Sequence, residues 1–85
     1  MNRKHRATLA AVFDTPTRSG LRFEEVKSLL LALGAEFEQR AGSRVVFTFR
    51  DGLILHMHRP HKPKTLRHYQ VEEIRDVLDS LGHRP

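Results

Sequence analysis

The stretch from Gly42 to Pro63, GSRVVFTFRDGLILHMHRPHKP, constrains the fold more than any other part of the chain. Two runs of apolar and β-branched residues, 45–49 and 53–57, flank an Asp-Gly pair. Such runs predict two strands, and Asp-Gly is a common pair in the tight turn of a β-hairpin. The chain must therefore accommodate an antiparallel hairpin, and three of its six histidines lie in this stretch.

The length of the turn decides which side chains share a face of the hairpin. A two-residue turn would pair Phe47 with His56 and mix polar and apolar residues on both faces. A three-residue turn over 50–52, with a left-handed Gly52 in a G1 bulge, gathers the apolar residues on one face. Because a shift of one residue reverses every side chain, burial favours the second register. The apolar pairs are then Phe49 with Leu53, Phe47 with Leu55, and Val45 with Met57.

The opposite face of this hairpin is basic and carries two histidines. In the favoured register, Arg44 lies directly across from His58. We expect any chemistry to occur on this face, because it is the solvated side of a half-buried sheet. Its members are Arg44, Val46, Thr48, Ile54, His56 and His58.

Three segments outside the hairpin show helical periodicity. Apolar residues recur at i, i+3 and i+4 within 3–13, 23–33 and 70–81. Gly34 and Gly82 follow the two longer helices, where a glycine commonly ends a helix. In the second helix the apolar stripe is widened by Leu31 and Ala32, which we expect to receive the first helix.

The remaining segments predict a strand and a loop. Residues 35–40 alternate, with Phe37 expected to face inward. Two prolines exclude a helix from 59–64, which we expect to be an exposed basic loop. Tyr69 is expected to pack at the start of the last helix. We assign Phe47 and Phe49 to the core.

Together these elements predict an α+β fold in a single domain spanning 1–85. The order is helix, helix, three antiparallel strands, helix, with the helices packed on one face of a three-stranded meander. Residues 23–82 form the core, and the helix at 3–13 is an N-terminal extension.

Composition narrows the classes of partner. The chain has 85 residues, no cysteine and a net charge of +5, so we expect a polyanion or an acidic protein as partner. The absence of cysteine fits a cytoplasmic location. No apolar run approaches the length of a membrane span, so no membrane partner is expected.

The histidines permit three kinds of chemistry. His56 and His58 point the same way on a strand, but only the distant Asp51 could complete a metal site, so we expect no metal or other cofactor. As acid and base, His58 and His61 could cleave RNA. From spacing alone, phosphate binding without cleavage is favoured. The candidate RNA-binding residues are Ser43, Arg44, His56, Arg59, Lys62 and Lys64.

In order along 23–82, the chain has a helix leading into LALGAEF, GSR opening a strand, the loop HRPHKPK, and a helix ending in LDSLG. In these features it resembles the HicA family of toxins. The resemblance implies a fold like the double-stranded-RNA-binding domain. It also implies a type II toxin–antitoxin system, in which a HicB-like antitoxin inhibits a metal-independent endoribonuclease, a nuclease and hydrolase of mRNA. The family's catalytic histidine belongs to a Gly-Ser-x-His element, and Val45 stands at its position here.

Two other functions remain open from the sequence. A non-catalytic domain of the same fold would bind RNA, or an acidic protein, through the basic face. A winged-helix DNA-binding domain would place its recognition helix before the hairpin, whereas here a helix follows it.

Overall fold

The computed structural model describes residues 1–85 and confirms the predicted α+β fold class. The three strands form one antiparallel sheet in the order β1-β2-β3, and the element order is α-α-β-β-β-α. The elements are α1 Arg3–Val12, α2 Phe23–Ala32, β1 Glu36–Gln39, β2 Arg44–Thr48, the 3-10 turn η1 Arg50–Gly52, β3 Ile54–His58 and α3 His68–Ser80.

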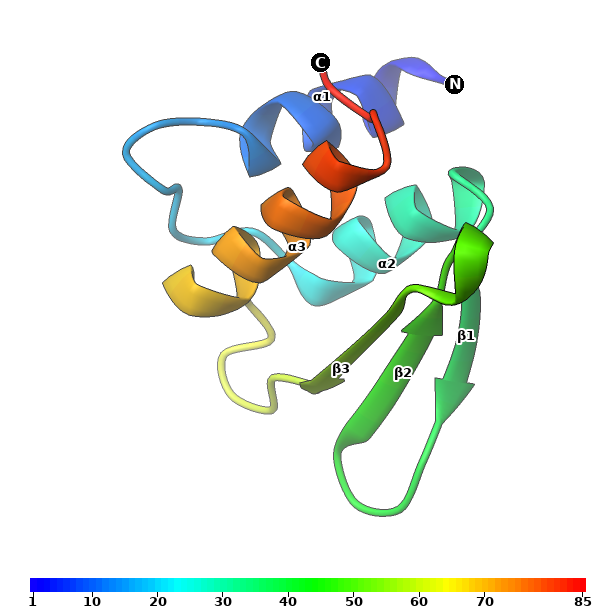
Figure 1. The fold of residues 1–85 in the computed structure, drawn as a ribbon. Coiled ribbons are helices and arrows are strands. Elements are labelled where there is room, and N and C mark those ends of the chain that lie inside the picture. The colour runs from blue at the N-terminus through cyan, green and yellow to red at the C-terminus, as the bar shows by residue number, and fades with distance from the viewer.

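The helices form two layers on one side of the sheet (Figure 1). The pair α2 and α3 lies next to the sheet, and α1 lies on the far side of that pair. The core fills the space between these layers. At its centre Phe47 of β2 is 1% exposed, and its ring contacts those of Phe23 and Phe37 at centroid distances of 6.3 and 5.1 Å. No helix covers the outer face of the sheet.

The hairpin adopts the predicted register. Arg44 pairs with His58, Val45 with Met57 and Phe47 with Leu55. These alternating pairs bury the apolar side chains against the helices and leave Arg44 and His58 exposed.

Three details of the hairpin differ from expectation. Asp51 is left-handed as well as Gly52, with φ of 65° and 77°, which a short polar residue tolerates better than most. Leu53, predicted on the apolar face, is 36% exposed and directly follows η1. Val46 lies on the outer face but is only 5% exposed, since it is on the central strand between Glu38 and His56.

Two expectations about the helices are wrong. Leu31 and Ala32 are exposed, and α1 instead meets the side of α2 that carries Ser28, whose Oγ lies 2.8 Å from His5 Nε2. Tyr69, which was expected to pack at the start of the last helix, is instead 56% exposed. Helix α3 starts two residues earlier than predicted, which places Tyr69 in its first turn. None of the helices has the length and hydrophobicity of a membrane span.

The central position of Phe47 can be tested by truncation. Phe47→Ala should lower the free energy of unfolding by about 3–5 kcal/mol, because it leaves a cavity between sheet and helices. Ile54→Ala on the outer face is the control, and since that side chain is 49% exposed the change should stay within about 0.5 kcal/mol. Urea unfolding measures both. Similar losses in the two variants would contradict the assignment of faces.

Candidate functional site

His58 ends β3 and is held from two directions. Its Nδ1 lies 3.0 Å from Ser43 Oγ, and its carbonyl oxygen accepts a hydrogen bond of 3.0 Å from Gln70 Nε2. The Arg59 backbone N–H also donates to the carbonyl oxygen of Ser43 at 2.7 Å. Gln70 is 3% exposed, so this hydrogen bond fixes the end of the strand to the first turn of α3. The imidazole itself remains exposed, with Nε2 free to meet a ligand.

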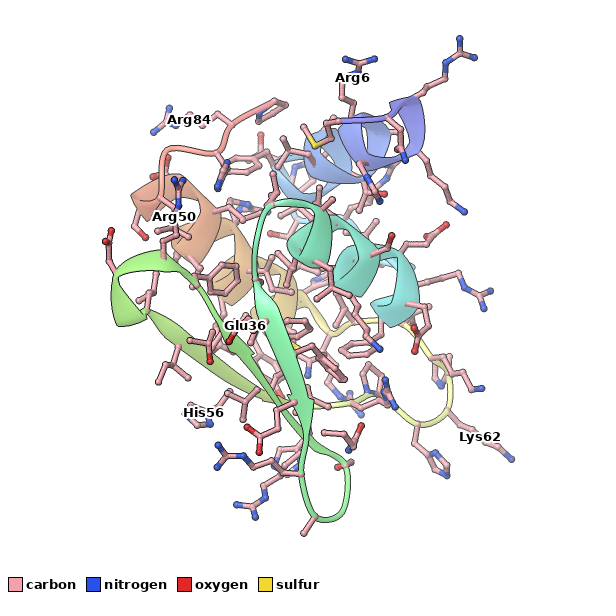
Figure 2. The ribbon with its side chains drawn as sticks, turned by 90° about the vertical axis from the view of Figure 1, so that its right-hand side faces the viewer. Arg6, Glu36, Arg50, His56, Lys62 and Arg84 are labelled. Carbon is pink, nitrogen blue, oxygen red and sulfur yellow. The ribbon has the colours of Figure 1, made fainter.

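The basic loop after β3 is exposed, as expected, yet its far end is anchored. Phe23 N–H donates to the carbonyl oxygen of Lys64 at 3.1 Å, and Leu66 N–H donates to that of Leu21 at 2.7 Å. Between these anchors and β3 the loop bends outward, and Lys62 projects away from the body of the protein (Figure 2). The loop therefore presents its cations on a backbone fixed at both ends.

A pocket of about 330 Å³ lies between this loop and the first turn of α3. Both candidate catalytic residues, His58 and His61, line it, together with Lys62, Arg67 and the exposed Tyr69. None of its 11 lining residues is an aspartate or glutamate. The pocket thus combines titratable imidazoles with uncompensated positive charge, a combination suited to phosphate.

Apart from Ser43, the candidate RNA-binding residues lie in two places, on the outer face of the sheet and on the basic loop after β3. On the outer face, Arg44 and His56 line a shallow pocket of about 120 Å³ that also includes His58. In Figure 2, His56 projects on the opposite side of the sheet end from Lys62. His58 lines both pockets and thus joins the two groups.

Arg59 differs from the other candidates because the fold already uses its guanidinium group. The group stacks over the Phe23 ring at 4.9 Å, and Nη2 lies 3.4 Å from Glu24 Oε2. The Nε atom is buried and has no hydrogen-bond partner. Arg59 therefore packs the loop onto α2 and has less freedom to follow a ligand than Lys62 or Lys64.

Val45, where the resemblance to the HicA family would place a catalytic histidine, is fully buried. In this register any side chain at position 45 faces the helices. An imidazole there would not reach solvent. Val45 pairs with Met57, and the exposed imidazoles of His56 and His58 flank this partner on β3.

Three polar residues that line the pocket, Arg67, Tyr69 and Gln70, are not among the candidate residues predicted from the sequence. Tyr69 was expected to pack, and Gln70 was counted only as part of a helix. Gln70 Oε1 accepts a hydrogen bond of 3.0 Å from Arg67 N–H, so a glutamine three residues after the N-cap residue of the helix was the available signal. No group of three or more His, Cys, Asp or Glu residues is arranged to hold a metal ion.

No family model, curated protein or solved structure matches the chain.

The hydrogen bond between Ser43 and His58 should select one tautomer of the imidazole. We expect long-range ¹H–¹⁵N spectra, recorded with neutral imidazoles, to show His58 in a single tautomer. Ser43→Ala should give a mixture, because the variant has no hydroxyl to bond Nδ1. His56 serves as the internal control and should be the same in both proteins. An unchanged His58 spectrum in the variant would show that Ser43 does not orient the ring.

Proposed function

We propose that this chain is a HicA-like toxin that binds RNA and cleaves it in the pocket between the basic loop and α3. One observation carries the proposal: two histidines and two unpaired cations line a pocket that contains no carboxylate. Imidazoles can transfer the protons, and cations can bind the phosphate and stabilise its charge, so these groups are suited to cleavage of a phosphodiester without a metal. The order of the elements and the GSR and HRPHKPK segments support the family resemblance.

Cleavage would use the ribose as the nucleophile. The 2′-OH attacks the adjacent phosphate while one imidazole takes its proton, and the other imidazole protonates the departing 5′-oxygen. The products are a 2′,3′-cyclic phosphate and a 5′-OH. Lys62 and Arg67 stabilise the negative charge of the phosphorane. In the tautomer whose Nδ1 donates to Ser43 Oγ, His58 presents a lone pair at Nε2 and can act as the base, with His61 as the acid.

A second candidate function is RNA binding without cleavage. The observation that favours it is the identity of residue 45. The resemblance would place a catalytic histidine there, but this chain has a buried valine, which cannot transfer a proton. The basic pocket and the outer-face residues Arg44 and His56 would then serve to bind phosphates alone. The two candidates predict the same binding and differ only in turnover.

A cleavage assay separates them. Purified protein should cut a long mRNA in the presence of EDTA, and both His58→Ala and His61→Ala should slow the cut by about 10²- to 10⁴-fold, because each removes a proton-transfer group. His83→Ala is the matched control, since this histidine lies beyond α3 and outside the pocket. A polynucleotide 5′-kinase should label the downstream product directly, because the proposed cleavage leaves a free 5′-OH.

Each alternative outcome has a definite meaning. Salt-sensitive binding without a cut by the wild-type protein would establish the non-catalytic function. Full activity in His58→Ala would remove this residue from the mechanism. Absence of RNA binding would contradict the proposal and leave the basic face to an acidic protein partner.

The proposal includes a HicB-like antitoxin as partner and action in the cytoplasm, where mRNA is translated. Expression of the chain in a bacterial host should arrest growth, and co-expression of a HicB-like protein from the neighbouring gene should restore it. His58→Ala is the control and should permit growth at equal protein level, because it retains the fold. Growth arrest that is equal in the two proteins would contradict a toxicity based on cleavage.

A further inference from the structure

A larger groove, of about 740 Å³, lies beside the loop and shares Arg59, Pro60 and His61 with the histidine pocket. Its remaining lining comes from the start of α2, from Lys64 and from the turn between β1 and β2. His61 therefore borders two hollows that lie next to each other. The groove falls within the size range of small-ligand sites and is large enough for part of a nucleotide chain.

The groove carries two cations that the fold does not neutralise. Arg22 and Lys64 line it, and neither takes part in any of the four ion pairs of the protein. Their backbones run side by side, because Arg22 forms a β-bridge with Thr65 and the Lys64 carbonyl accepts from Phe23 N–H. The one acid in the lining, Glu24, is occupied by Arg59 at 3.4 Å.

We propose that this groove binds a second phosphate of the same RNA strand, held by Arg22 and Lys64, so that the strand crosses the loop over His61. The inference rests on the proposed function, because the first phosphate occupies the histidine pocket. It adds Arg22, which the sequence did not single out, as a binding residue. It also sets a minimum length for a tightly bound RNA, since a dinucleotide fills only the pocket.

RNA is favoured over an acidic peptide because the two hollows are adjacent and share Arg59, Pro60 and His61. A polyanion long enough to extend beyond the pocket can pass over these shared residues into the groove. A peptide in the groove alone would contact His61 but not His58, which lines the histidine pocket and not the groove. The charge of the groove does not distinguish the two ligands, so the experiment includes both.

The test measures binding of 2′-O-methyl RNA, which cannot be cleaved, in lengths of two to eight nucleotides by fluorescence anisotropy. Wild-type affinity should rise once the strand is long enough to reach the groove. Arg22→Ala and Lys64→Ala should each remove most of this rise and leave the dinucleotide unchanged. The slope of log K against log salt for the octamer should become shallower by about 0.7 for each phosphate that the variant no longer neutralises.

Arg50→Ala is the matched control, because this arginine is exposed in η1 at the other end of the sheet (Figure 2). It should bind every length as the wild type does. An equal loss of affinity for dinucleotide and octamer, or no loss, would overturn the groove assignment while the proposed function stands. Wild-type protein that binds no RNA would overturn both. Polyglutamate affinity that depends on Arg22, with octamer affinity that does not, would assign the groove to an acidic protein.

Discussion

The register of the β2–β3 hairpin is the constraint on which the rest of the structure depends. It turns Val45 and Phe47 of the central strand toward the helices, together with Leu55 and Met57 of β3. Burial of each such side chain contributes about 1.5–3 kcal/mol, so a slip of one residue would expose most of the sheet's share of the core. The same alternation leaves His58 exposed at the strand end. Core packing and the position of the candidate site therefore have one cause.

The exposed imidazole of His58 has a defined position because the end of β3 is fixed. Gln70 hydrogen-bonds the His58 carbonyl and also accepts from Arg67 N–H, so one buried side chain orders both the strand end and the start of α3. The loop between them is closed by the bonds to Leu21 and Phe23. A short basic segment without regular structure thus gains a defined shape from neutral backbone hydrogen bonds, which leaves the charges of its lysines free for a ligand.

The sequence predicted the parts of the structure that follow from periodicity. Strand alternation gave the hairpin register, and helical spacing gave three helices to within two residues. It did not predict the exposure of Tyr69 or of Leu31, because each depends on where one helix lies against another. The pocket was also beyond prediction. It is formed by a loop and a helix start whose approach depends on single hydrogen bonds from Gln70, and no periodic pattern reveals such bonds.

The burial of Val45 restricts the positions on this sheet at which a catalytic side chain could lie. A catalytic group must be exposed and also held in place, and on β2 the outward-facing positions nearest the turn with Ser43 are Arg44 and the sheltered Val46. An edge strand offers more freedom, because its side chains have a neighbour on one side only. His58 lies on such a strand, across from Arg44 and in contact with Ser43. A histidine at position 58 on the edge strand thus has the serine and the arginine as neighbours, while Val45 packs in the core better than an imidazole would.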